Sequence, residues 1–125
     1  MRALLIRTPH IEKILDGKKT WEIRGSRTNV RGMIGLIRSG SGNVIGVCKV
    51  IDCIGPLTSE QFLRNARRAA IKPSEAVRSR YKKTFAWVIT NPCYLRREVS
   101  YTHPRGAVIW VKLDSKTEKA VRGAS

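Results

Sequence analysis

Short apolar runs alternate with polar, glycine-rich breaks along this chain, a pattern typical of a small β-rich fold. β-Forming residues predict strands at residues 4–6, 20–24, 33–38, 44–54, 85–95 and 107–113. Residues 39–43 are glycine, serine and asparagine, so the third and fourth runs should form an antiparallel hairpin. Asn91-Pro92 predicts a bend or bulge in the fifth run. Because a small sheet must cover its edges, we expect a closed or nearly closed antiparallel or mixed barrel.

Short helices should lie between these strands. One should begin at Thr8-Pro9, where threonine can cap a helix and proline fits its first turn, and should end at Gly17. A second should begin at the capping sequence 58–61 and run to about Ala70. A third short helix should follow Pro73. The tryptophans Trp21, Trp87 and Trp110 lie within β-runs, and we expect all three in the core.

The charge balance predicts a class of partner. Lysine and arginine total 25 against 9 aspartate and glutamate residues, a net charge of +16, and such a field concentrates polyanions at the surface. Much of it lies between residues 64 and 83, where the cations are Arg64, Arg67, Arg68, Lys72, Arg78, Arg80, Lys82 and Lys83. That run is either a solvated helix face or a surface that follows a phosphate backbone. Nucleic acid is the expected partner class, although basic proteins can also be merely soluble.

The length and the cysteines set further bounds. A chain of 125 residues predicts one domain, at residues 1–113, followed by a polar and flexible tail at residues 114–125. Cys48 and Cys53 lie in an apolar run without a C-x-x-C pair, so we expect reduced core thiols, a cytoplasmic location and no structural metal or cofactor. No apolar stretch approaches the length of a membrane span. A monomer or weak homodimer is expected.

The densest group of chemically active residues is Gly17-Lys18-Lys19-Thr20-Trp21-Glu22-Ile23-Arg24. Side chains alternate along a strand, so Thr20, Glu22 and Arg24 should share one face while Trp21 and Ile23 enter the core. Lys19 should stand at the mouth of this site, and the neighbouring positive charges favour the carboxylate form of Glu22. On pattern alone, an ion pair between Arg24 and Glu22 that stabilises the strand surface is a simpler interpretation than catalysis.

These residues carry a resemblance to a known family. The motif G-x-K-x-x-E-x-R, which is read here at Gly17, Lys19, Glu22 and Arg24, is similar to the signature of the ASCH domain. Residues 86–92 and 101–110 resemble the family as well, and the likeness extends from about Ala3 to Leu113. It implies an α+β, β-rich fold: a PUA-like small β-barrel with short peripheral helices and a cleft into which the signature residues project.

The resemblance also implies a choice of functions, since ASCH domains are regarded as RNA-binding modules, as ribonucleases or as amidohydrolases acting on acetylated cytidine. In the amidohydrolase branch a threonine nucleophile occupies the position that Glu22 holds here, which counts against that activity. Thr20 is displaced by two residues, roughly 7 Å of strand rise, too far to substitute. The resemblance therefore implies that Lys19 corresponds to the lysine of the family, but it assigns no residue of this chain as the nucleophile.

The leading hypothesis is an RNA-binding protein, with single-stranded RNA favoured over a free nucleoside, that uses a basic cleft. The expected nucleic-acid contacts are Arg7, Gly17, Lys19, Arg24, Arg27, Arg31, Tyr101, His103 and Arg105. The second hypothesis is an enzyme in which Lys19 and Glu22 act as acid and base, with His10 and His103 as a further candidate pair. A protein-binding module whose basic face meets an acidic partner is the third.

Overall fold

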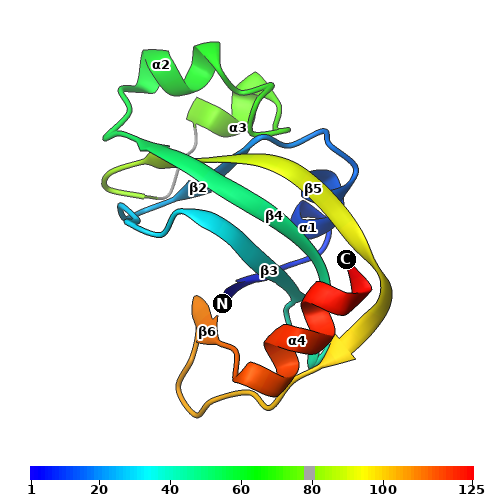
Figure 1. Cartoon of the computed structure of the whole chain (residues 1–125). Coiled ribbons are helices and arrows are strands. Elements are labelled where there is room, and N and C mark those ends of the chain that lie inside the picture. The colour runs from blue at the N-terminus through cyan, green and yellow to red at the C-terminus, as the bar shows by residue number, and fades with distance from the viewer. Residues whose placement is uncertain (78–80) are drawn as a thin grey trace.

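The computed structural model describes residues 1–77 and 81–125 and builds them into one strongly curved sheet with short helices around it (Figure 1). The elements are β1 (Arg2–Ile6), α1 (His10–Leu15), β2 (Trp21–Arg24), β3 (Gly32–Arg38), β4 (Asn43–Ile54), α2 (Ser59–Arg64), α3 (Pro73–Val77), β5 (Phe85–Ser100), β6 (Trp110–Lys112) and α4 (Ser115–Ala124). Arg78 and Arg80 of the expected basic run lie outside the described residues. Among the described residues, no helix has the length and apolar character needed to cross a membrane.

The sheet is mixed, with the strand order β2-β5-β4-β3-β1-β6. β1 pairs with β3 in parallel and the other neighbours are antiparallel, including the predicted β3–β4 hairpin. The predicted bulge at Asn91-Pro92 is confirmed: Thr90 lies opposite Lys49 and Cys93 opposite Val47, so β5 carries one residue more than β4 between these pairs. Such irregularities let the two longest strands bend, and the sheet curls into a half-barrel whose edges are β2 and β6.

The concave side of the sheet holds the main core. Leu4, Leu36 and Trp87 are buried there together with Ile11 and Leu15 from α1. α1 approaches β4 closely because Gly46 has no side chain; a Cβ at this position would clash with Leu15 Cδ2. This contact fixes α1, and with it the turn that leads into β2.

The segment after α2 covers the edge of β2. The capping box of Thr58 and Gln61 is confirmed, but α2 ends at Arg64 and not near Ala70. Residues 65–70 form turns instead, and Ala70 adopts a positive φ of 55°. The carbonyl of Arg68 consequently accepts hydrogen bonds from the backbone N–H groups of Thr20 and Trp21, both at 2.9 Å. Short-range capping signals predicted where this helix starts, and tertiary pairing with β2 decides where it stops.

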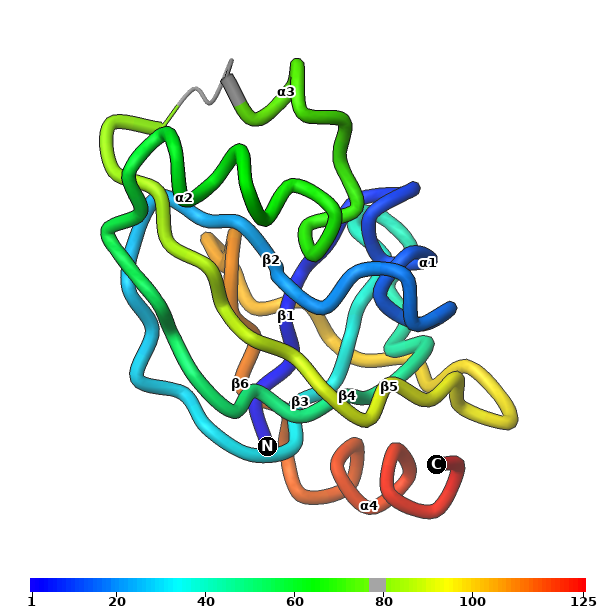
Figure 2. The backbone as a smooth tube through the Cα atoms, turned by 90° about the horizontal axis from the view of Figure 1, so that it is seen from above, coloured from blue at the N-terminus to red at the C-terminus, as the bar shows by residue number. Residues whose placement is uncertain are grey.

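The C-terminal segment differs most from expectation. Residues 114–125 do not form a flexible tail, because Ser115–Ala124 is helix α4, capped by the Asp114 side chain. Val121 and Ala124 are fully buried against the convex side of the sheet, where Leu95 and Val99 of β5 also lie (Figure 2). The few apolar residues of this segment fall on one side of the helix, a pattern too sparse to stand out beside its charged residues. The sheet supplies the apolar surface that stabilises it.

Two smaller expectations were also wrong. Thr8 does not cap α1: the cap position is Pro9, and the Thr8 hydroxyl donates to Glu12 Oε2 at 3.1 Å. The last strand is limited to Trp110–Lys112 and does not begin at residue 107. The expected burial of Cys48, Cys53, Trp21 and Trp87 is confirmed, whereas Trp110 is half-buried.

The docking of α4 can be tested with Val121→Ala. Removing two buried carbon atoms should lower the free energy of unfolding by about 1.5–2.5 kcal/mol. Urea denaturation followed by circular dichroism measures this, with the exposed Lys119→Ala on the same helix as the control. Equal and negligible changes in both variants would show that α4 does not pack against the sheet in solution.

Candidate functional site

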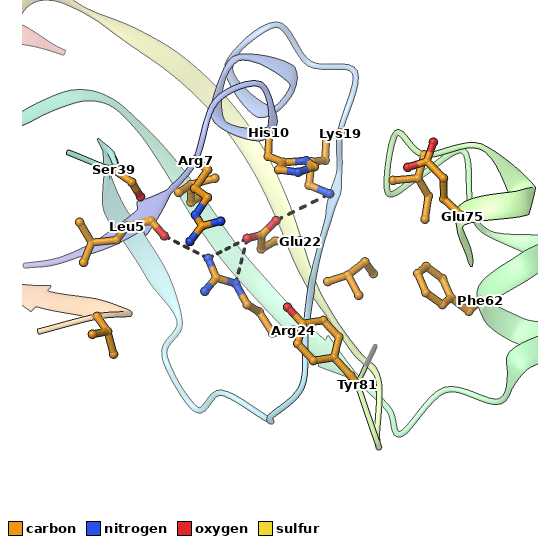
Figure 3. A pocket seen from close by; sticks show the side chains of 14 residues that line it. Leu5, Arg7, His10, Lys19, Glu22, Arg24, Ser39, Phe62, Glu75 and Tyr81 are labelled. Carbon is orange, nitrogen blue, oxygen red and sulfur yellow. Dashed lines mark hydrogen bonds and ion pairs between the residues drawn. The ribbon is translucent and has the colours of Figure 1, made fainter. Parts of the chain in front are cut away.

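A pocket of about 700 Å³ lies where the C-terminal end of β1, the strand β2 and the α2–α3 region meet (Figure 3). Its charged and titratable lining residues are Arg7, His10, Lys19, Glu22, Arg24 and Glu75. Its apolar and aromatic walls include Ile23, Phe62, Ile71, Tyr81 and Val108. Five of the residues that the sequence singled out are therefore brought together: Arg7, His10, Lys19, Glu22 and Arg24.

Strand alternation delivers the central pair of this pocket. Trp21 turns away from it into the apolar cluster under α2 and α3. Glu22 and Arg24, two residues apart, both line the pocket. Ile23, expected in the core, is only half-buried and also contributes to the pocket wall. The pairing of Glu22 with Trp87 on β5 holds this register in place.

The carboxylate of Glu22 is buried, with 6% of the residue exposed, and its two oxygens have different surroundings. Oε2 accepts a hydrogen bond from Arg24 Nε at 2.9 Å and lies 2.8 Å from Arg24 Nη2. Oε1 lies 3.6 Å from Lys19 Nζ, which is longer than an ordinary hydrogen bond. Oε1 therefore keeps capacity to accept a hydrogen bond from a ligand.

Lys19 is buried and does not stand at the mouth of the site, since only 4% of it is exposed. Its Nζ donates to the carbonyl of Ala69 at 2.8 Å, within the turns that follow α2. Burial lowers the pKa of Lys19 below its ordinary value of 10.5, and the carboxylate of Glu22 offsets that effect only in part. A lysine of this kind is a precisely placed cation whose neutral form is easier to reach than that of a surface lysine.

Arg24 joins the pocket to the core. Its Nη2 donates to the carbonyl of Leu5 at 3.1 Å, and its guanidinium carbon lies 5.5 Å from the centre of the Trp87 ring. With Glu22 on the other side, the planar guanidinium is held on three sides. Arg7 differs, since its side chain is exposed and has no hydrogen bond or ion pair with the described residues.

His10 stands at the start of α1 and lines the same pocket. Partial burial, followed by the charge of Lys19, lowers the pKa of His10 below its ordinary value of 6.5, while Glu22 acts in the opposite direction. The imidazole is consequently neutral at neutral pH. Because the unfolded chain takes up this proton first as the pH falls, His10 lowers the stability of the fold on acidification from about 6.5 down through its own pKa.

An NMR titration of His10 tests this electrostatic arrangement. In Lys19→Met the pKa of His10 should rise, because a nearby positive charge is removed, and in Glu22→Gln it should fall. Glu60→Gln, which neutralises an exposed carboxylate of α2 outside the pocket, is the control and should leave the pKa of His10 unchanged. A His10 pKa that is unchanged in both variants would contradict the proximity of these three groups.

The remaining predicted contacts lie elsewhere. Arg27 donates to the carbonyl of Gly55 at 2.8 Å, and Arg31 donates to the carbonyls of Thr28 and Val30 at 3.0 and 2.8 Å. Both arginines line a second pocket and not the first. They lie beside the signature along the chain, but the loop after β2 places them in the lining of the second pocket and not with Glu22.

Tyr101 and His103, which were predicted to contact RNA, form hydrogen bonds within their own loop instead. Tyr101 Oη and His103 Nδ1 lie 2.8 Å apart, and His103 Nε2 lies 2.9 Å from the carbonyl of Ala107. Neither residue lines the first pocket, so His10 and His103 are not brought together there, and Arg105 is exposed on the loop. Gly17 has a φ of +79°, which ends α1 as predicted, and does not line the pocket.

Several pocket residues escaped sequence reasoning. Phe62, Glu75 and Tyr81 come from α2, α3 and the segment before β5, far from the signature along the chain. The ring of Tyr81 packs against Gly25, where a Cβ would lie 2.7 Å from Tyr81 Cδ1. In the sequence, Tyr81 could have been recognised as a pocket residue only because it is an aromatic residue within a basic run. Within residues 1–77 and 81–125, no three His, Cys, Asp or Glu side chains are grouped as metal ligands.

The family model of the ASCH domain matches residues 4–98. The crystal structure of ASCH from Zymomonas mobilis is similar over 98% of this chain and 93% of its own, with a TM-score of 0.75 and 14% identity. A point variant of ZmASCH from the same organism aligns over 99% of this chain and 96% of its own, with a TM-score of 0.72 and 17% identity. No curated protein matches the chain.

Proposed function

This chain belongs to the ASCH domain family, whose fold is PUA-like, and on that basis we propose that it binds RNA by taking one nucleotide into the pocket around Lys19, Glu22 and Arg24. The observation that carries the proposal is the geometry of Glu22. A buried carboxylate with one oxygen fixed by Arg24 and the other still able to accept is suited to the amino edge of a base. The volume of about 700 Å³ suits a single nucleotide better than a stretch of strand.

The charges around Glu22 support a phosphate-bearing ligand. Arg7, Lys19 and Arg24 face two carboxylates, Glu22 and Glu75, so the lining carries an excess of positive charge. Arg7 is exposed and uncommitted, and its planar guanidinium can contact phosphate oxygens in a bidentate manner. Arg7 is therefore the phosphate contact in this proposal, while Lys19 and Arg24 hold the carboxylate.

The apolar walls favour an unpaired base. Phe62, Tyr81 and Val108 offer surfaces for contact with a base face, which single-stranded RNA can present and duplex RNA cannot. Single-stranded RNA therefore remains the favoured partner, with a modified nucleoside as the alternative ligand of the same pocket.

Fluorescence anisotropy with a short labelled single-stranded RNA over a salt series tests the proposal. Arg7→Met should weaken binding at least tenfold at each salt concentration, because a charge-assisted contact is lost and no bond within the fold is broken. The Lys19→Met, Arg24→Met double variant should abolish binding in the pocket. Circular dichroism should check that this double variant is folded, because it leaves the carboxylate of Glu22 without both of its cationic partners.

Arg97→Met is the matched control, because it removes the same charge from an exposed position of β5 outside both pockets. If Arg7→Met and Arg97→Met weaken binding equally, the attraction is diffuse and the pocket is not the RNA site. Modified nucleosides would then be screened as ligands of the pocket instead of RNA.

A hydrolase is the second candidate, and the buried Lys19 favours it. An amine with a lowered pKa beside a carboxylate and a neutral His10 supplies groups for proton transfer. The ribonuclease reaction fits this set of groups better than the amidohydrolase reaction does. The resemblance implies a threonine nucleophile for the amidohydrolase branch at the position that Glu22 holds here. Unchanged RNA and unchanged acetylcytidine after long incubation with the pure protein would exclude both.

A further inference from the structure

A second basic pocket, of about 780 Å³, opens beside β6 and the loop after β2. Its cationic lining residues are Arg2, Arg27, Arg31 and Lys112, and none of its described lining residues is acidic. The amino group of Met1, which also lines it, is paired with Glu118 of α4. The pocket therefore presents four arginine and lysine side chains with no carboxylate among them.

Two of these cations are forced together by strand pairing. Arg2 of β1 and Lys112 of β6 lie directly opposite each other in the antiparallel register, so their side chains share one face roughly 5 Å apart at Cβ. Both residues are exposed, and neither side chain has a hydrogen bond or ion pair with the described residues. Like charges placed opposite each other destabilise a sheet, and a bound anion would relieve that repulsion.

The other two cations are held in place by the fold. Arg27 is fixed by the Gly55 carbonyl and lies 5.1 Å from the centre of the Phe85 ring. Arg31 is fixed by the carbonyls of Thr28 and Val30. Guanidinium groups that are already oriented lose less freedom when they contact a ligand.

The segment at residues 108–112 and the strand β1 contribute lining residues to both pockets. Val108 lines the first pocket and Trp110 lines the second, so Ile109 alone separates the two linings along this segment. β1 also contributes to both, with Leu5 and Ile6 at one end and Arg2 at the other. A strand rises roughly 3.3 Å per residue, so Arg2 and Arg7 are about 16 Å apart along the chain. A free nucleoside is too short to reach both ends.

We propose that the second pocket, centred on Arg2 and Lys112, binds the phosphate backbone of the same RNA whose nucleotide enters the first pocket, so that the ligand is a strand of several nucleotides. Trp110, half-buried and stacked on Trp87 at a centroid distance of 5.7 Å, offers a rigid aromatic surface within it. This inference rests on the proposed function for the identity of the ligand. The paired cations of β1 and β6 are its independent support.

The test compares an eight-nucleotide single-stranded RNA with a nucleoside monophosphate, in the intact protein and in Arg2→Gln, Lys112→Gln. For the oligonucleotide, affinity should fall about tenfold or more, and the slope of log affinity against log salt should become shallower by about 1.4, or 0.7 for each lost contact. For the monophosphate, affinity should stay unchanged. Arg97→Gln, Lys116→Gln is the control, because it removes one exposed arginine and one exposed lysine outside both pockets.

Each outcome has one meaning. Equal losses of oligonucleotide affinity in the test and control variants would overturn the second site. So would an oligonucleotide that binds the intact protein no more tightly than the monophosphate. A loss of inorganic pyrophosphate binding in the test variant, with oligonucleotide binding intact, would assign the pocket to small anions and overturn the RNA backbone as its ligand. If Arg7→Met has no effect while Arg2→Gln, Lys112→Gln does, the proposed function fails and the second site stands.

Discussion

Replacing Glu22 by alanine should lower the free energy of unfolding by about 3–5 kcal/mol, because it leaves two partly or fully buried cations without their carboxylate. The side chains of Lys19 and Arg24 are only 3% and 18% exposed, and both lie against Glu22. Lys19 can escape part of this cost by releasing its proton, since burial already lowers its pKa. The loss should therefore diminish as the pH rises toward the ordinary pKa of lysine.

Urea denaturation at several pH values measures this effect, with two further variants. Glu60→Ala removes a carboxylate that is 77% exposed and paired with Arg64, and it should change stability by no more than about 0.5 kcal/mol. Lys19→Met, Glu22→Met removes both charges and should cost less than Glu22→Ala alone. A Glu22→Ala variant as stable as Glu60→Ala would show that the carboxylate does not organise the pocket.

Trp87→Ala should also lower the free energy of unfolding by about 3–5 kcal/mol, through the loss of a large buried ring. Trp87 is 2% exposed, stacks on Trp110 and lies beneath the guanidinium of Arg24. Its Nε1 donates to the carbonyl of Ser26 at 2.9 Å, which ties β5 to the loop after β2. The substitution therefore removes a support shared by both pockets.

Trp87→Phe separates packing from hydrogen bonding in this prediction. Phenylalanine keeps an aromatic ring between Arg24 and Trp110 but leaves the Ser26 carbonyl without its donor, at a cost of about 1–3 kcal/mol for the lost bond. Thermal unfolding followed by near-ultraviolet circular dichroism reports both the stability and the order of the tryptophans. If Trp87→Ala were no less stable than Trp87→Phe, the ring would not be packed as described.

The buried charges bear on function as well as on stability. A buried ion pair is seldom more stable than apolar residues of the same size, so the Lys19–Glu22–Arg24 group is poorly explained as a device for folding. In the proposed function, this group holds a carboxylate oxygen and two cations at fixed places in a pocket, as ligand recognition requires. The Glu22 and Trp87 variants measure how far the free energy of unfolding depends on this group and on the ring that supports it.

Much of the framework was determined by local sequence. The hairpin of β3 and β4, the bulge at Asn91, the capping box at Thr58 and the left-handed Gly17 each depend on residues that are neighbours along the chain. The alternation of Trp21, Glu22 and Arg24 follows from strand geometry in the same way, and the signature that carries the family resemblance lies within eight residues.

Tertiary structure decided what depends on contacts between distant segments. Lys19 is buried because the turns at Ala69 fold over β2, and α4 is stable because β5 offers it an apolar surface. The separation of Arg27 and Arg31 from Glu22, and the meeting of Arg2 with Lys112, follow from how the curved sheet brings its strands and loops together. A charge pattern specifies how many cations a chain has, but desolvation and strand register determine which of them are held together and left without a partner.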